Sequence, residues 1–363
     1  MSKPVAALLW ILAGIASALL ALELLLRILP VSGKGTYGAE VDPNWPMHHL
    51  LPNSSFTYSA GWNLDNVQQG HINNMGYVAP FDYVAGSPGI VVIGDSYIES
   101  LMNEYSQTLQ GRLGGLLDAS VDKGAAVMEF ANSGGSMPDY LAVAGLVAGR
   151  FKPTWGVVVI SEGDFVEGFS PNHGYHNWDP AANPPVKLIG ADQERSELAK
   201  WARRLALIRY VRYNLKVDLS RLIHAEPVLP KAQVVRECEP VELSPDDTKL
   251  ASAFVELLPK QFGLDPSRIV LVFDSNRKLL YDPAGRSDLR CPSRDSVAQK
   301  LIHESAKERG MHVVDTGPIF AEYYARTHRR VDHSPVDWHW NSTAHELVAN
   351  EVAAVMNEAS RAR

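Results

Sequence analysis

Short apolar runs alternate with amphipathic stretches along most of the chain. Residues 90–93 (Ile-Val-Val-Ile) end at Gly94, which is typical of a strand covered on both faces. Similar runs follow at residues 127–131, 155–160, 269–273 and 312–314. Apolar residues at helical spacing lie between and after them, at residues 109–117, 140–148, 249–261, 296–309 and 342–357. This alternation predicts an α/β fold, a three-layer α/β/α sandwich around a mainly parallel, flavodoxin-like sheet.

The N-terminal segment has a different pattern. Residues 5–26 are almost uninterrupted apolar sequence, broken only by Glu23, and are long enough to cross a bilayer as a helix. We interpret residues 1–30 as a transmembrane anchor. A cleaved signal peptide is an alternative because residues 16–18 (Ala-Ser-Ala) resemble a cleavage site, although they lie inside the apolar stretch. A buried core helix is the third interpretation.

The charges that flank the apolar segment hardly decide its orientation. Lys3 precedes it, whereas Arg27 and Lys34 follow it. A short N-terminal head before a long domain favours export of that domain. We therefore expect a single-pass membrane protein whose main domain is extracytoplasmic or periplasmic.

Two segments interrupt the strand and helix alternation. Residues 31–88 are rich in Asn, Gly, Pro and aromatic residues without steady periodicity, which predicts a loop-rich extension packed against a main domain at residues 89–363. Residues 165–243 are predicted to form an insertion near the mouth of an active site, where it would serve as a lid or a substrate platform. Its basic helical stretch, residues 200–221, is equally well explained as a solvated helical face.

Composition and charge narrow the class of protein. The chain is 46% hydrophobic with a net charge of -7, which is typical of a globular protein and argues against a nucleic-acid partner. Its two cysteines, Cys238 and Cys291, lie in loop-like sequence. In an exported domain they predict one disulfide, whereas in a reducing cytoplasm they would be two unrelated thiols.

Candidate chemistry lies at two distant places. Gly94-Asp95-Ser96 follows the first predicted strand, at the sheet edge where parallel sheets bind ligands. A serine nucleophile needs a base and oxyanion donors. Asp337 and His339 precede the last predicted helix, and residues two apart in an extended segment project to one side, so Asp337 can reach His339 Nδ1. Either motif alone is more often an ordinary turn or loop.

Together, these two motifs resemble those of the SGNH/GDSL hydrolase family. The first block of that family is G-D-S, and its last block is D-x-x-H or, in many bacterial membrane-anchored members, D-x-H-W-N. Residues 73–77 (Asn-Asn-Met-Gly-Tyr) and 274–277 (Asp-Ser-Asn-Arg) are also similar to family segments. The resemblance covers about residues 72–356. It implies a serine hydrolase with Ser96 as nucleophile, His339 as base and Asp337 as its orienting carboxylate.

The resemblance also implies where the oxyanion donors lie. They would be the backbone N–H of Gly135, with Gly134 as a close alternative, and a group in the stretch that matches the family's G-x-N-D block, where Gly163 keeps its backbone N–H as a donor. In this chain Gly163 stands where the family has Asn. Loss of one donor typically costs about 10²–10³ in rate. The candidate substitutes are the Ser96 N–H and the side chains of Asn132, Asn172 and Asn177. Asp164 is expected to be structural.

Several potential metal ligands crowd near the last motif, namely His328, Asp332, His333, Asp337 and His339. They lack the helical spacing of a zinc-binding H-E-x-x-H motif, and the family's mechanism uses no metal. We expect neither a metal nor a cofactor.

The function that this resemblance implies is a serine esterase. It would cleave O-acyl esters, most simply O-acetyl esters, through an acyl-serine intermediate on an envelope or exported carbohydrate or on a small ester. One alternative is O-acyl transfer to polysaccharide by the same triad, because residues 337–341 also resemble alginate O-acetyltransferase-like relatives. Another is a non-catalytic envelope-binding module, which Gly163 favours and the intact Ser96, Asp337 and His339 oppose.

Overall fold

A central parallel sheet organises the computed structural model, which describes residues 3–33, 45–119, 121, 125–171, 174–189, 201–217, 240–281, 291–335 and 337–362. Its strands follow the order β4-β3-β5-β8-β9 and are all parallel. Their bounds are β3 (Pro88–Gly94), β4 (Ala126–Ala131), β5 (Lys152–Ile160), β8 (Ile269–Phe273) and β9 (His312–Asp315). Because β3 lies between β4 and β5, the winding reverses there, as in a flavodoxin-like sheet. The predicted fold class is confirmed.

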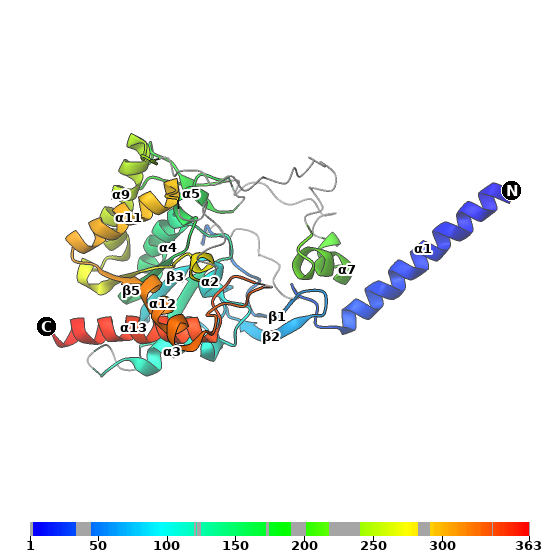
Figure 1. Ribbon diagram of the computed structural model, residues 1–363, viewed down its shortest axis with the longest axis horizontal. Coiled ribbons are helices and arrows are strands. Elements are labelled where there is room, and N and C mark those ends of the chain that lie inside the picture. Colours follow the sequence, from blue (N-terminus) through cyan, green and yellow to red (C-terminus); the bar gives the residue numbers. More distant parts are fainter. Residues whose placement is uncertain are drawn as a thin grey trace.

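Helices cover both faces of this sheet. Figure 1 shows α4 (Met137–Arg150), α9 (Pro245–Phe262) and α11 (Arg294–Glu308) on one side. On the other side lie α3 (Leu109–Leu116), α12 (Thr316–Thr327) and α13 (Ser342–Arg361). Of these six helices, α12 was not predicted. The three layers of the predicted sandwich are therefore present.

The apolar strand sequences follow from this two-sided burial. Ile90 and Val92 pack in the core beneath α3 and α13, whereas Val91 and Ile93 pack in the core beneath α4 and α9. Because successive strand residues face opposite sides, both positions must be apolar. Every residue of β8 is buried for the same reason.

The last helix begins where its sequence predicts. Asn341 is the N-cap of α13, and its Oδ1 accepts the N–H groups of Thr343 at 3.0 Å and Ala344 at 3.1 Å. This cap ends the segment that carries Asp337 and His339. It therefore fixes where that segment meets the packed core.

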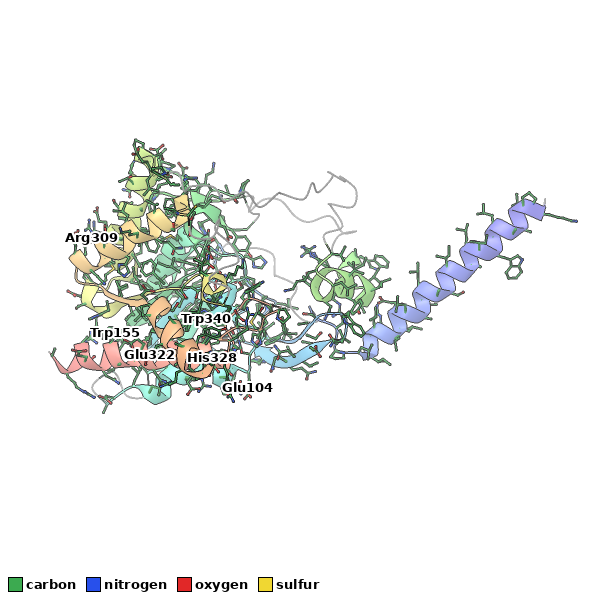
Figure 2. All side chains as sticks on the ribbon, viewed as in Figure 1. Glu104, Trp155, Arg309, Glu322, His328 and Trp340 are labelled. Carbon is green, nitrogen blue, oxygen red and sulfur yellow. The ribbon has the colours of Figure 1, made fainter. Side chains whose placement is uncertain are left out.

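The apolar N-terminal segment forms one helix, α1 (Lys3–Ile28), which extends away from the sheet (Figure 1). It is long and apolar enough to cross a membrane, and none of its most hydrophobic stretch is buried. Figure 2 shows side chains projecting all round it. This exposure rules out a buried core helix. A membrane anchor and a signal sequence both match such a helix.

The segment predicted to be loop-rich, residues 31–88, contains a hairpin. Strands β1 (Ser54–Ala60) and β2 (Asp65–Ile72) pair antiparallel. Phe56 and Ile72 from this hairpin pack with Leu50 and Val78 in a small apolar cluster. The prediction missed the hairpin because its second strand is mostly polar and carries no apolar alternation.

The insertion region holds only short elements among its described residues. They are α5 (Asp164–Glu167), the hairpin of β6 (His176–Trp178) and β7 (Val186–Leu188), α7 (Ala206–Arg209) and the π-helix η2 (Tyr210–Asn214). Elsewhere the short elements are α2 (Ser96–Glu99), η1 (Tyr105–Gln107), η3 (Pro266–Arg268) and α10 (Arg277–Tyr281). Cys291 is disulfide-bonded. Its predicted partner, Cys238, lies outside the described residues.

Candidate active site

Ser96 lies directly after β3, at the point where the winding of the sheet reverses. It is the first residue of α2, and the preceding Asp95 is the N-cap, whose Oδ1 accepts the Tyr97 N–H at 2.9 Å. Because β3 is wholly packed from Gly89 to Gly94, the turn that carries Ser96 starts from a rigid support. The Ser96 hydroxyl thus lies at the edge where open α/β sheets bind ligands.

The predicted triad residues are joined in one hydrogen-bonded chain. His339 Nε2 lies 2.7 Å from Ser96 Oγ. On the other side of the ring, His339 Nδ1 contacts Asp337 Oδ1, which also accepts the His339 backbone N–H at 3.0 Å. Ser96 and His339 are 243 residues apart. The geometry is that of a nucleophile, a base and a carboxylate that orients the base.

Asp337 is held in its charged form. Burial alone would raise the pKa of its carboxyl, but the hydrogen bond and charge of His339, and then the charge of Lys216, hold that pKa well below its usual range. Its second oxygen, Oδ2, accepts the Tyr58 hydroxyl at 2.9 Å and lies 3.5 Å from Lys216 Nζ. Both carboxylate oxygens are therefore engaged.

The segment that carries His339 is anchored on each side of the imidazole. Arg277 donates to the Trp338 carbonyl at 2.7 Å and to the Tyr97 hydroxyl at 2.8 Å. Trp340 is fully buried (labelled in Figure 2), and its indole N–H donates to Asp274 Oδ1 at 2.8 Å. The Tyr97 ring lies 4.8 Å from the imidazole ring. These contacts fix the orientation of His339 towards Ser96.

The loop after β4 departs from one oxyanion prediction. The Gly135 N–H, predicted as a donor, is hydrogen-bonded to the Asn132 carbonyl at 2.8 Å and is not available. Its neighbour Gly134 has a left-handed backbone with φ +86°, and its N–H has no acceptor among the residues that the structure describes. A Cβ on Gly135 would lie 3.8 Å from the Gly94 carbonyl, so this loop lies against the end of β3.

The loop after β5 corrects a second prediction. The Gly163 N–H, also predicted as a donor, binds Asp295 Oδ2 at 2.9 Å, and Asp295 Oδ1 accepts the Phe165 N–H at 3.0 Å. Gly163 has φ +105°, and a Cβ there would lie 3.0 Å from Glu167 Oε1. A left-handed backbone and a close side chain explain why glycine, rather than a larger residue, fits this position.

Asp164 lies behind the site, as expected. Its Oδ2 accepts the Ser161 N–H at 2.7 Å and the Tyr140 hydroxyl at 2.8 Å. The Ser161 hydroxyl lies 2.8 Å from Asp164 Oδ1 and 2.9 Å from Asp95 Oδ2. Burial, followed by the neighbouring Asp95 charge, raises the pKa of Asp164 well above its usual value. This cluster ties the end of β5 to the turn that carries Ser96.

A second buried carboxyl supports the loop after β4. Glu99 in α2 accepts the Ser133 hydroxyl, one residue before Gly134. Burial raises the pKa of Glu99 to about 7, although the hydroxyl and the backbone N–H of Ser133 oppose this rise. The structure thus links α2 directly to the loop that carries Gly134.

The three asparagines proposed as substitute donors have different surroundings. Asn132 is buried, and its backbone N–H donates to the Gly94 carbonyl at 3.3 Å. Asn177 lies within β6 and is also buried. Asn172 lies outside the described residues.

Two of the residues considered as metal ligands, Asp332 and His333, are bonded to protein groups. Asp332 pairs with Arg330 at 3.2 Å, and His333 Nε2 contacts Asn103 Oδ1 at 3.1 Å. Within the described ranges, no group of three or more His, Cys, Asp or Glu side chains is placed to hold a metal ion.

Sequence reasoning missed Tyr58 and Lys216, which both reach Asp337. The alternation of Phe56, Tyr58 and Ala60 before Gly61 is a signal for a strand and turn that was overlooked. No local signal connects Tyr58 with Asp337, which is 279 residues away. Lys216 lies in a stretch whose charges had an equally good explanation as a solvated face.

Comparison with known proteins gives only distant likenesses. No family model matches the chain, and no curated protein matches it. Among solved structures it is similar to LAE5, an α/β hydrolase enzyme from the metagenome of Lake Arreo, Spain, with 16% identity over 76% of this chain and 96% of that chain and a TM-score of 0.39. It is also similar to a catalytic mutant of Axe2, an acetylxylan esterase from Geobacillus stearothermophilus, with 16% identity over 75% and 94% of the two chains and a TM-score of 0.36. Likenesses this distant do not bear on the substrate or mechanism of this chain.

Proposed function

We propose that this chain is a serine esterase with Ser96 as nucleophile, His339 as general base and Asp337 as the carboxylate that orients His339. The observation that carries the proposal is the continuous chain of contacts from Ser96 Oγ through the imidazole to Asp337. A serine hydroxyl alone is a weak nucleophile, and an oriented imidazole supplies the base that it needs.

The reaction proceeds in two half-reactions. Ser96 Oγ attacks the ester carbonyl carbon while its proton moves to His339 Nε2. The resulting oxyanion collapses, and the alcohol leaves with that proton, which produces an acyl-Ser96. Water then attacks the acyl group with His339 again as base, and the released acid regenerates the Ser96 hydroxyl.

The oxyanion donors that we propose are the backbone N–H groups of Ser96 and Gly134. Neither N–H has a protein acceptor among the described residues, whereas those of Gly135 and Gly163 are committed to Asn132 and Asp295. Donors that are already in place at the developing charge cost no reorganisation during the reaction. In this assignment, Gly134 takes the place of the predicted donors Gly135 and Gly163.

For the substrate we propose an O-acetylated carbohydrate. Trp338, next to His339, is 40% exposed, and its ring lies 5.2 Å from Lys278 Nζ and 5.3 Å from the Arg330 guanidinium. An aromatic surface beside cationic donors suits a ligand that carries both apolar faces and hydroxyl groups. We further propose that α1 is an uncleaved anchor and that the main domain is extracytoplasmic.

The test is hydrolysis of an aryl acetate by the full-length chain in detergent, compared with Ser96→Ala. We expect Ser96→Ala to lose at least about 10³-fold in kcat/KM while its circular dichroism stays unchanged, because residual catalysis comes only from binding and the oxyanion donors. Equal activity of the two proteins would refute the assignment. Acetylated oligosaccharides with and without an unacetylated acceptor then separate hydrolysis from transfer, since transfer yields acetylated acceptor.

A further inference from the structure

The end of α1 is built into the folded domain. Glu23, the acidic residue that interrupts the apolar run, accepts the Ala206 N–H at 3.0 Å and the Leu207 N–H at 2.9 Å. These are the first two residues of α7, so Glu23 supplies the cap that α7 lacks in its own sequence. Leu26 is 4% exposed and packs with Val31 and Ala206.

The elements that follow α7 are bonded to the β1–β2 hairpin. We call residues 206–216 the α7 platform. Asn214, which is buried, donates to the Ser59 carbonyl at 3.1 Å and accepts the Ser32 N–H at 3.0 Å. The Tyr210 hydroxyl donates to the Trp62 carbonyl at 2.7 Å. The platform, the hairpin and the end of α1 thus form one bonded unit, which Figure 1 shows beside the sheet domain.

Two residues of this unit contact the carboxylate of Asp337. Tyr58 from β1 donates to Asp337 Oδ2 at 2.9 Å, and Lys216 from the platform places Nζ 3.5 Å from the same oxygen. Burial and the neighbouring carboxylate raise the pKa of Tyr58, so its hydroxyl remains a donor. Lys216 has a left-handed backbone with φ +52°, an uncommon conformation for lysine that the surrounding contacts must maintain.

We propose that Tyr58 and Lys216 are positioning residues for Asp337, and that the end of α1 holds the unit that delivers them. Oδ1 of Asp337 must face His339 Nδ1, and fixing Oδ2 prevents the carboxylate from turning away. The attachment of α1 to the domain thereby becomes part of the active-site geometry. This inference rests on the proposed esterase function and adds which residues hold the Asp337 carboxylate in place.

The test uses full-length protein in detergent and three variants with matched controls. Tyr58→Phe is compared with Tyr323→Phe, Lys216→Met with Lys300→Met on the surface of α11, and Glu23→Ala with Glu256→Ala on the surface of α9. The readouts are kcat and KM on an aryl acetate, the pH profile of kcat/KM, and the thermal melt. The melt identifies any variant that fails to fold.

We expect Tyr58→Phe to lower kcat roughly tenfold with KM nearly unchanged, because a hydrogen bond to a charged group is lost. Lys216→Met should lower kcat roughly twofold, since the Lys216 side chain is half exposed. Glu23→Ala, which removes the cap of α7 together with the contact of Glu23 to Arg27, should lower kcat roughly fivefold because it loosens the platform. The controls should stay unchanged.

The pH profile separates positioning from general stability. Removing a donor or a positive charge beside Asp337 leaves that carboxylate more negative, so the acid limb of kcat/KM should move to higher pH by roughly a few tenths of a unit in Tyr58→Phe and Lys216→Met. Asp95, Glu99 and His333 also act on this His339–Asp337 pair and are unchanged in these variants.

Three outcomes would each overturn a different part of the proposal. A parent protein that neither hydrolyses the ester nor depends on Ser96 would sink the esterase proposal itself. An active parent whose Tyr58→Phe and Lys216→Met variants match their controls in kcat and in the acid limb would overturn the positioning roles. A Glu23→Ala variant with unchanged kcat would overturn the connection to α1.

Discussion

The loops after β4 and β5 flank the same strand, yet they offer opposite surfaces to a ligand. The loop after β4 leaves the Gly134 N–H without an acceptor among the described residues and rests on Glu99 through Ser133. The loop after β5 directs its Gly163 N–H onto Asp295 of α11. Position at the sheet edge alone therefore does not make an N–H a donor to the ligand. A carboxylate behind the loop can take up the N–H group instead, as Asp295 does with that of Gly163.

Among the variants that test this difference between the two loops, Asp295→Ala is expected to have the largest effect. Asp295 accepts the N–H groups of Gly163 and Phe165 and the side-chain amide of Gln299 at 2.9 Å. Leaving these partly buried donors without a partner should cost about 3 kcal/mol in the free energy of unfolding. Chemical denaturation checks this, with Asp246→Ala in the first turn of α9 as the control. A loss equal to that of the control would show that Asp295 does not hold the loop.

Glu99→Gln tests the support of the other loop through pH. The ordinary pKa of Glu99 is 4.5 and burial raises it to about 7, so the folded state holds this proton more tightly than the unfolded state. Its contribution to stability is complete below about pH 4.5 and is lost as the pH rises through 7, by about 3 kcal/mol in all. Glutamine does not titrate.

The unfolding free energy of Glu99→Gln should therefore increase relative to the parent between pH 5 and pH 8. Denaturation of both proteins at the two pH values measures this difference, and the exposed Glu104→Gln serves as control. A difference that does not vary with pH would show that Glu99 is not a buried, titrating carboxyl.

Gly163→Asn has the smallest expected effect and tests whether an oxyanion donor is missing at this position. Asparagine at φ +105° with its Cβ 3.0 Å from Glu167 Oε1 should destabilise the protein by about 1–2 kcal/mol. We expect kcat on an aryl acetate to fall or stay level, because Gly163 holds the loop in shape through its N–H bond to Asp295. A clear increase in kcat would show that an oxyanion donor is missing there after all.

The sheet could be predicted because its strands are covered on both faces. That burial requires wholly apolar runs such as residues 269–273, every one of which is buried in β8. The hairpin β1–β2 was missed, since β2 is largely polar and exposed on alternate residues. Helix α12 was missed although Ile319, Phe320 and Tyr323 have helical spacing and pack on the core, because Gly317 and Pro318 at its start are typical of a turn.

The site was predictable only where local sequence determines it. Ser96 follows a buried strand, and Asp337 and His339 are two residues apart, so each motif is visible alone. The state of the Gly163 N–H depends on Asp295, 132 residues away, and the support of Asp337 comes from Tyr58, 279 residues away. Such long-range contacts leave no local pattern.

The most direct test of the central claim is labelling by a serine-reactive phosphonate, followed by peptide mass spectrometry. We expect the full-length protein to carry the label on Ser96, Ser96→Ala to carry none, and His339→Ala to react at least about 10²-fold more slowly because its base is gone. Label at another residue, or equal labelling of the parent and Ser96→Ala, would contradict the account.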